Sequence, residues 1–420
     1  MPGTNANHVA IIGGGVIGAM CAWNLVQAGC QVTIIDRDKF GAACSHGNCG
    51  YIVPSHVLPL TQPGAIRSTI KDMMKRNSPF AVKPRFSLDA LSWFWKFSRR
   101  CNHDSMMEAA HGLHAMLQSS MQLYKELIQS ENIECEWREV GLLTVYDTEA
   151  GFNAFEKTNR LLQENFGVSA TPYDAAAMVE LEPALKPGFG GGWHFEGDCH
   201  MRPEKFMAVM KERLAAKGVN IVEQVSVDHF VRENGAAKAI SGSGQTYDAD
   251  QFVVATGAMT PFLNKHLGCK IPIQPGKGYS LTMPTPERMP KIPLIFHDSH
   301  VGITPMETKY RIGSTMEFVG YDTSINAKRL NLLKDAAIKY LHDPLCDPIE
   351  ETWFGWRPMT WDGKPIVDRS PAMKNVWIAS GHNMIGLSMA TATGRLVREM
   401  MLGETPHLDP SHYSVARLRK

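Results

Sequence analysis

The stretch VAIIGGGVIGAMCAWNLVQAG, residues 9–29, is the most apolar run near the start of the 420-residue chain. It is open to three interpretations: a membrane anchor, a secretion signal, or the start of a nucleotide-binding fold. A membrane-spanning helix needs about 20 mainly apolar residues, so the length nearly suffices. A signal peptide needs a basic segment before its apolar run, but the preceding MPGTNANH contains neither Lys nor Arg. A secretion signal is therefore disfavoured.

The order of residues inside this stretch favours the nucleotide-binding fold. Residues 8–12 are apolar and β-branched, which is typical of a buried strand. Residues 13–15 are glycines, which suit a tight turn but destabilise a helix interior. Residues 16–28 have helical spacing and stop at Gly29, and QVTIID, 31–36, predicts a second strand. Strand, glycine turn, helix and strand form one βαβ unit, so we expect a soluble α/β fold.

The glycines of this turn match the pattern G-x-G-x-x-G at Gly13, Gly15 and Gly18. In this pattern the first glycine permits the turn, the second lets the backbone approach a pyrophosphate, and the third lets helix and strand pack closely. The helix N-terminus offers unpaired N–H groups to the phosphates, and Asp36 stands where an acid would bind a ribose hydroxyl. A purely structural turn is the alternative. The context favours dinucleotide binding but does not distinguish NAD from FAD.

Composition restricts the class of protein. The chain is too long for a single core, so we expect two domains, and 44% apolar with 20% charged residues fits a soluble globular enzyme. Lys plus Arg number 43 against 42 Asp plus Glu, which gives no reason to expect a nucleic acid partner. Nine cysteines without a C-x-x-C motif predict reduced thiols and a cytoplasmic location. We identify no metal site, because no histidine pair has a matching carboxylate or thiol cluster.

Two later segments repeat the pattern of a strand followed by glycine. DQFVVATGAMT, residues 250–260, predicts a buried strand that ends near Thr256 and Gly257. VWIASGHNMIGLSMATATGRLVREMM, residues 376–401, predicts a strand, a turn and a helix whose N-terminus near residues 385–387 faces an electron-rich part of a cofactor. Such distant strands can meet in one sheet, so the nucleotide domain is expected to be discontinuous. Our predicted boundaries are 1–60, 185–265 and 350–420 for the nucleotide domain, with 61–184 and 266–349 forming a substrate domain.

Periodicity predicts further elements. Helices are expected over 105–130, 151–166, 203–217 and 326–342, and strands near 219–223, 251–255, 301–304, 310–315 and 376–379. PGFGGGW, residues 187–193, is expected to be a loop because of its glycines.

Over nearly its whole length the chain resembles the D-amino-acid oxidase superfamily of FAD enzymes, and most closely the D-amino-acid dehydrogenases. Beyond the N-terminal motif, CSHGNCG, 44–50, resembles the serine–asparagine–glycine loop beside the flavin. PGKGYSLT, 275–282, resembles the strand that leads into the substrate domain, and GWRPMTWDGKPIVD, 355–368, resembles the arginine–proline signature. GHNMIGLSMATATG, 381–394, resembles the final flavin-binding helix. Five matches in the family's order make a chance resemblance implausible.

The resemblance implies a discontinuous Rossmann-like FAD-binding domain of α/β type. An α+β substrate domain, built on a mixed or antiparallel β-sheet, is inserted into it. Some relatives attach FAD covalently to a histidine, but Gly47 occupies that position and His46 is one residue out of register, so we expect non-covalent FAD. Most relatives carry Glu where Asp36 stands. The residues expected to bind FAD are Gly13, Gly15, Val16, Ile17, Gly18, Asp36, Arg37, Ser45, Asn48, Gly50, Val225, Thr256, Gly257, Gly381, Met384, Ile385, Gly386, Leu387 and Ser388.

Four residues are candidates for contact with the substrate. The resemblance implies that Arg357 binds the substrate carboxylate through its two-pronged guanidinium, with a structural role as the alternative. Tyr279 either offers its hydroxyl to the substrate or packs over the site. His56 stands where relatives usually have an aromatic residue, and it either contacts a polar substituent or is simply packed. His200, like the nearby Arg202, belongs to a possible pocket segment, GDCHMRP at 197–203, although an ion pair beneath a turn explains both residues nearly as well.

The implied reaction is oxidation of a D-amino acid, or of a cyclic imino acid of the D-proline or hydroxyproline type. Hydride passes from Cα to flavin N5, and the product is an imine that hydrolyses or a cyclic imine. The electron acceptor is left open among a quinone, an electron-transfer partner and O₂. The alternatives are an O₂-using oxidase of sarcosine or glycine-like amines, an NAD-dependent dehydrogenase, and a non-catalytic dinucleotide-binding scaffold.

Residues 73–100 mix basic residues with Phe and Trp, a composition that suits a segment lying on a membrane surface. Peripheral association with the inner face of a membrane is therefore one expectation for this stretch. The alternative is an amphipathic helix packed on the substrate domain, with Trp93, Phe94, Trp95 and Phe97 in the core or at a subunit interface.

Overall fold

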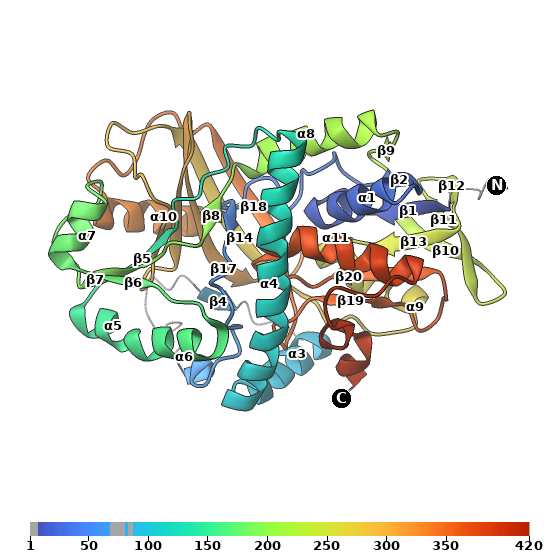
Figure 1. The fold of residues 1–420 in the computed structure, drawn as a ribbon, viewed down its shortest axis with the longest axis horizontal. Coiled ribbons are helices and arrows are strands. Elements are labelled where there is room, and N and C mark those ends of the chain that lie inside the picture. Colours follow the sequence, from blue (N-terminus) through green and yellow to red (C-terminus); the bar gives the residue numbers. More distant parts are fainter. Residues whose placement is uncertain (1–6, 68–79, 83–86, 420) are drawn as a thin grey trace.

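A six-stranded sheet forms one half of the protein in the computed structural model, which describes residues 7–67, 80–82 and 87–419 (Figure 1). Its strands, in spatial order, are β19 (Ile366–Arg369), β20 (Val376–Ser380), β13 (Gln251–Val254), β1 (His8–Ile12), β2 (Gln31–Ile35) and β9 (Asn220–Val222). Neighbouring strands run parallel, except for the antiparallel pair β19 and β20. Strands far apart in sequence therefore meet beside the first glycine turn.

Helix α1 (Val16–Gln27) explains why the opening stretch resembles a membrane segment. Eight of its 12 residues are buried, because it packs between the sheet and helix α11 (Gly386–Leu402). A helix that is apolar on all sides belongs in the interior of a large protein as readily as in a bilayer. Helices α4 (His103–Glu131) and α8 (Pro203–Ala216) contribute to the same core.

A nine-stranded mixed sheet forms the other half (Figure 1). Its strands are β18 (Glu351–Met359), β14 (Gln274–Pro284), β17 (Lys309–Phe318), β16 (Val301–Pro305), β15 (Leu294–Phe296), β5 (Leu142–Tyr146), β7 (Gly191–Phe195) and β6 (Thr171–Asp174), and β4 (Phe80–Val82) pairs with β17. The helices of this half are α5 (Glu149–Ala154), α6 (Glu156–Phe166), α7 (Ala175–Leu181) and α10 (Ala327–Tyr340). Two sheets of these types confirm the expected fold class.

Smaller elements complete the described chain. A three-stranded antiparallel sheet contains β10 (Val227–Glu233), β11 (Ala236–Gly242) and β12 (Gln245–Asp248), and β3 (Tyr51–Ile52) pairs with β8 (Cys199–His200). Helix α9 (Asn264–Leu267) follows the 3₁₀ helix η1 (Gly257–Leu263), and η2 (Pro410–Tyr413) and η3 (Val415–Arg419) end the chain.

Sheet membership differs from the predicted domain boundaries at two strands. Strand β7, placed with the nucleotide domain by sequence, pairs with β5 and β6 in the nine-stranded sheet. Strand β18, at the start of the predicted 350–420 segment, pairs with β14 in the same sheet. The predicted loop over 187–193 is also wrong in its last three residues, because Gly191–Trp193 pair on both sides as part of β7. Clustered glycines usually indicate a loop, but Gly191 and Gly192 lie within a strand.

Helix α4 also crosses the predicted partition. It lies within the segment expected to be substrate domain, yet it runs past α11 in Figure 1 and shares the core of the six-stranded half. The Tyr124 hydroxyl donates to the Leu387 carbonyl at 2.8 Å, and the Ser120 and Thr391 hydroxyls are 2.7 Å apart. Helix α4 therefore stabilises the position of the first turns of α11.

The basic and aromatic segment contains helix α3 (Leu88–Arg100), whereas its residues 73–79 and 83–86 lie outside the described part of the chain. Trp93 is buried and stacks on Phe97, with ring centroids 5.3 Å apart. Trp95, which was expected in a core or interface, is 59% exposed. Leu88 and Leu91 are exposed to a similar or greater extent. None of the helices in residues 7–67, 80–82 and 87–419 has the length and hydropathy to span a bilayer.

Candidate active site

A cavity of about 1970 Å³ is lined by residues from both large sheets. Sites for drug-sized ligands usually occupy roughly 300–1,000 Å³, so this cavity has room for a dinucleotide and a small substrate together. One end is formed by the glycine turn after β1 and the end of β2. The other end is formed by β14, β17, β18 and the start of α11.

The glycine turn separates packing roles from a cofactor-facing role. Gly13 has φ of +108°, and a Cβ there would lie 2.5 Å from the Ala255 carbonyl oxygen. A Cβ on Gly18 would lie 1.9 Å from the Gly13 carbonyl oxygen, so helix and strand approach as the motif requires. Near Gly15 the only protein atom within 4 Å of such a Cβ is Ser45 Oγ, at 3.3 Å, among the described residues. The space next to Gly15 belongs to the cavity.

Asp36 is held rigidly at the end of β2. Its Oδ2 accepts the Gly14 N–H at 2.5 Å, and its Oδ1 accepts the Asp38 N–H at 2.8 Å. Burial raises the pKa of this carboxyl. Because Asp36 lines the cavity beside the helix N-terminus, its position fits an acceptor for ribose hydroxyls.

All but three of the predicted FAD-binding residues line this cavity, and the exceptions are Gly18, Gly381 and Ser388. Ser388 supports the cavity wall without lining it: its Oγ donates to the Tyr51 carbonyl at 2.9 Å and accepts the Val53 N–H at 3.1 Å. These two bonds fasten the segment after the flavin loop to the first turn of α11. Gly381, with φ of +75°, supports the turn that precedes this helix. These three residues shape the site without facing it.

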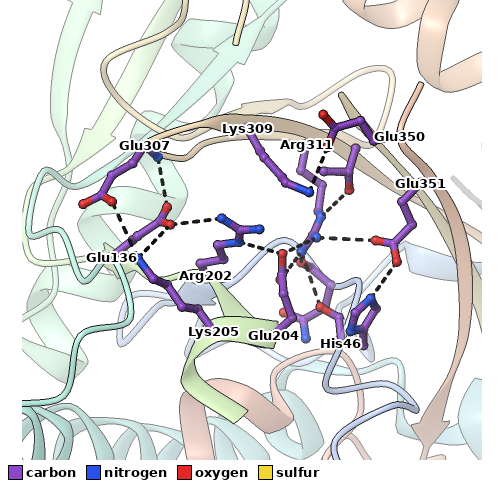
Figure 2. A network of polar contacts seen from close by, with 12 residues as sticks. His46, Glu136, Arg202, Glu204, Lys205, Glu307, Lys309, Arg311, Glu350 and Glu351 are labelled. Atoms are coloured by element: carbon purple, nitrogen blue, oxygen red, sulfur yellow. Dashed lines mark hydrogen bonds and ion pairs between the residues drawn. The ribbon is translucent and has the colours of Figure 1, made fainter. Parts of the chain in front are cut away.

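The predicted flavin loop, residues 44–50, is supported by a buried arginine on β17 (Figure 2). Arg311 is 0% exposed, and its Nη1 donates to the Asn48 carbonyl at 2.9 Å and to the His46 carbonyl at 3.4 Å. Nε donates to Thr282 Oγ1 at 2.9 Å, and Glu204 of α8 accepts from both terminal nitrogens at 3.2 and 3.1 Å. One guanidinium thus joins the loop to both halves of the protein.

His46 points into this network and not into the cavity. Its Nε2 lies 2.6 Å from Glu351 Oε1, and this contact raises the pKa of the imidazole (Figure 2). His46 is absent from the residues that line the cavity, whereas Gly47 is among them. The geometry therefore fits FAD held without a bond to histidine.

The sequence did not identify Arg311 as a functional residue. Its bonds to the flavin loop nevertheless lead to a testable prediction. Arg311→Met should weaken FAD binding about tenfold or more, about 1.4 kcal/mol, because the two loop carbonyls lose their donor. Fluorescence titration of the apoprotein with FAD measures this. Arg417→Met is a matched control, since it also removes an arginine from a mostly buried ion pair, at 2.7 Å to Asp362, away from the cavity. Equal FAD affinities in both variants would contradict the positioning role.

Arg357, on the edge strand β18, lines the same cavity. Its Nη1 donates to the Thr315 carbonyl at 2.8 Å. Burial lowers the pKa of the guanidinium, which nevertheless stays charged at neutral pH. Within the described residues no carboxylate lies at ion-pair distance from it. A charge that is partly removed from water is normally paired, so the half-buried Arg357 guanidinium is suited to an anionic ligand.

The surroundings of Arg357 are built to hold it in place. A Cβ on Gly278 of β14 would lie 2.4 Å from Arg357 Nη1, so a glycine is required for this approach. Thr315 has φ of +54°, and its buried Oγ1 has no partner in the described part of the chain. The same is true of the Trp356 indole nitrogen. Both residues line the cavity, where unpaired polar atoms are available to a ligand.

The other predicted substrate residues have different positions. Tyr279 lines the cavity, but its hydroxyl donates to Glu317 Oε2 at 2.8 Å, which favours packing over the site. His56 lines the cavity, and burial lowers the pKa of its imidazole to about 4.

His200 is not among the cavity residues, and its Nε2 donates to the Pro305 carbonyl at 3.1 Å. This geometry does not support the assignment of His200 to the pocket. Its neighbour Arg202 makes the ion pairs expected as the alternative, at 3.2 Å to Glu136 and 2.8 Å to Glu204.

The family is now decided by comparison with known proteins. Residues 8–400 match the DAO family model, described as FAD dependent oxidoreductase. The chain belongs to this family. The superfamily expectation is therefore confirmed, and FAD is the cofactor of this DAO-family enzyme. The finer resemblance to D-amino-acid dehydrogenases stays a prediction.

Solved structures share the fold of this DAO-family protein over almost their whole length. Glycine oxidase from Geobacillus kaustophilus is 20% identical with a TM-score of 0.77, covering 98% of this chain and 99% of that one. L-proline dehydrogenase from P. horikoshii is 19% identical with a TM-score of 0.73, and the coverages are 99% and 98%. Iminodiacetate oxidase from Chelativorans sp. BNC1 is 20% identical with a TM-score of 0.72, and the coverages are 97% and 98%.

Proposed function

We propose that this protein oxidises a D-amino acid or a cyclic imino acid of the D-proline or hydroxyproline type. The observation that carries the proposal is the half-buried Arg357, which lines the cavity without a carboxylate partner in the described chain. A bidentate bond between guanidinium and carboxylate fixes the orientation of an amino acid as well as its affinity. When bound, FAD supplies the two-electron acceptor for hydride from the substrate Cα.

The remaining walls favour a small, compact substrate. The aromatic residues Tyr279, Phe354 and Trp356 are among those that line the cavity. Their apolar rings suit the apolar part of a compact ligand. The unpaired Thr315 hydroxyl gives a further polar contact. An apolar ring with one carboxylate, as in proline, matches this distribution of groups.

A glycine-like or sarcosine-like amine is the second candidate. The fold similarity to glycine oxidase, at a TM-score of 0.77, supports it. The two candidates are separated by an anaerobic absorbance experiment with D-proline, hydroxyproline isomers, other D-amino acids, glycine and sarcosine. Bleaching of the flavin by the imino acids supports the first, and bleaching by glycine or sarcosine alone supports the second. Bleaching by none of them would contradict both and would favour a scaffold.

The electron acceptor is proposed to be a quinone, an electron-transfer partner or O₂. Aerobic turnover with stoichiometric hydrogen peroxide would identify O₂ as the acceptor, and turnover that requires an added quinone would exclude it.

Peripheral membrane association is proposed from α3, where Leu88, Leu91 and Trp95 are exposed at helical spacing. Wild-type protein should sediment with anionic vesicles, and Trp95→Ser with Leu91→Ser should reduce the bound fraction severalfold. Because these side chains contribute little to the core, circular dichroism should be unchanged. Wild-type protein that stays in the supernatant at low salt would contradict this proposal.

A further inference from the structure

Three polar side chains form a chain that leads from the cavity into the protein interior. His56, which lines the cavity, has Nδ1 3.3 Å from Ser55 Oγ. Ser55 Oγ lies 2.5 Å from Asp198 Oδ2, and the Ser55 N–H donates to Asp198 Oδ1 at 3.1 Å. Asp198, just before β8, is 1% exposed and is not a cavity residue. The imidazole is thus connected to a buried carboxyl 143 residues away in sequence.

These three side chains lie near α11, the helix predicted to complete the FAD-binding site. The His56 N–H donates to the Val53 carbonyl at 3.1 Å, and the Val53 N–H donates to Ser388 Oγ at 3.1 Å in the first turn of α11. The segment that carries His56 is therefore tied to the N-terminal turn of this helix, whose first residues also line the cavity.

Asp198 is an unusual carboxyl because it is buried without a cation. Within the described residues, no Lys, Arg or His nitrogen lies at ion-pair distance from it, and its partner is the neutral Ser55. Burial raises the pKa of Asp198 to about 7, although the bonds from Ser55 oppose this shift. Burial also raises the pKa of the adjacent Cys199 thiol to about 12, so that thiol stays neutral. His56 is neutral as well at pH 7, since its pKa is lowered to about 4.

The state of Asp198 determines which nitrogen of His56 carries the proton. When Asp198 is ionised, the single Ser55 hydroxyl proton is donated to the carboxylate. Ser55 Oγ can then only accept from His56 Nδ1–H, which leaves a lone pair on His56 Nε2. When Asp198 is protonated, it donates to Ser55, Ser55 donates to Nδ1, and the proton of His56 resides on Nε2.

We propose that His56, Ser55 and Asp198 form a proton relay that deprotonates the ammonium group of the bound substrate. This inference rests on the proposed oxidation of an amino or imino acid. The substrate N–H bond breaks and its proton bonds to His56 Nε2, the Nδ1 proton moves to Ser55 Oγ, and the Ser55 proton moves to Asp198. An ammonium and a carboxylate become a neutral amine and a carboxylic acid, and no electrons are transferred. The neutral amine is the form from which the Cα–H bond can be oxidised.

The relay avoids placing a positive charge on the half-buried His56 imidazole. His56 gains one proton and loses another, so it is neutral before and after the step. The charge change occurs between the substrate and Asp198. A carboxyl that titrates near neutral pH is matched to such a task, because it can accept the proton and release it again.

The relay predicts a pH dependence for the anaerobic bleaching of the flavin by substrate. Only ionised Asp198 accepts a proton, so the rate should rise with pH around 7. Asp198→Asn and Ser55→Ala should each remove this limb of the profile and lower the rate at pH 8 by roughly a hundredfold. Ser55→Ala leaves the buried carboxyl in place, so it tests the relay even where Asp198→Asn folds poorly.

A second readout does not require catalysis. An infrared band from a protonated carboxyl should disappear from the wild-type holoenzyme as pH rises through about 7, and Asp198→Asn should lack that band. Ser414→Ala and Asp368→Asn are matched controls, because Ser414 Oγ donates to Asp368 Oδ2 at 2.6 Å outside the cavity. Both controls should keep the wild-type pH profile.

Two outcomes would overturn the relay. One is a wild-type enzyme that is bleached by substrate while Ser55→Ala and Asp198→Asn keep its rate within twofold and its limb near pH 7. The other is an infrared titration in which the Asp198 carboxyl stays ionised down to pH 5. A wild-type enzyme whose flavin no amino or imino acid bleaches would instead contradict the proposed function itself.

Discussion

Arg357→Ala is expected to leave FAD bound while lowering kcat/KM for carboxylate substrates by roughly a thousandfold, about 4 kcal/mol. The reason is that Arg357 faces the cavity with no carboxylate partner among the described residues, so removing it leaves the substrate carboxylate buried and unpaired. Loss of orientation at Cα adds to the loss of affinity. Steady-state kinetics, together with the FAD-to-protein ratio from absorbance, measures both effects.

The matched variant is Arg357→Lys, which keeps the charge but loses the two-pronged geometry. It should retain more activity than Arg357→Ala while remaining clearly below the wild type. Neither variant should alter the FAD content, since the pyrophosphate end of the cavity is formed by the turn after β1. Unchanged kinetics in Arg357→Ala would exclude this residue as the carboxylate anchor.

Gly15→Val is expected to yield folded protein without FAD, with the apparent Kd for FAD raised by roughly a hundredfold or more, about 2.7 kcal/mol. A side chain at Gly15 would occupy cavity space, and its Cβ would meet only Ser45 Oγ at 3.3 Å within the described chain. At Gly13 or Gly18, by contrast, a Cβ would overlap backbone atoms, so those variants should fail to fold. Gel filtration followed by absorbance and circular dichroism distinguishes these outcomes.

Gly197→Val provides the control for this second prediction. A Cβ at Gly197 meets no described atom within 4 Å, its φ is not positive, and it does not line the cavity. This variant should bind FAD like the wild type. If Gly15→Val retained stoichiometric FAD, the assignment of the glycine turn to the pyrophosphate would be wrong.

Local patterns account for what could be predicted from the sequence. The spacing of Gly13, Gly15 and Gly18 with flanking apolar runs predicted the β1–α1–β2 unit, because a tight turn and close packing restrict the residues that fit. The long helices α4, α8 and α10 also followed from their periodicity. Most predicted FAD-binding residues line one cavity because they follow strands of the six-stranded sheet or begin the helices that pack on it.

Contacts between distant segments could not be read in this way. Arg311 binds the carbonyls of a loop more than 260 residues away, and only its place between Tyr310 and Ile312 hinted at a buried role. Asp198 lies two residues before His200 in the possible pocket segment 197–203, but its contact with Ser55 joins residues 143 positions apart and leaves no local pattern. The pairing of β7 and β18 depended on neighbouring strands that local propensity does not specify.

The central claim is that the cavity selects an oxidisable amine by its carboxylate. The most direct test is to compare D-proline with pyrrolidine, which lacks the carboxylate, in anaerobic reduction of the wild-type enzyme under identical conditions. We expect D-proline to bleach the flavin and pyrrolidine, at the same concentration, to leave it oxidised. Equal bleaching by both compounds, or purified protein that neither contains nor binds FAD, would contradict the account.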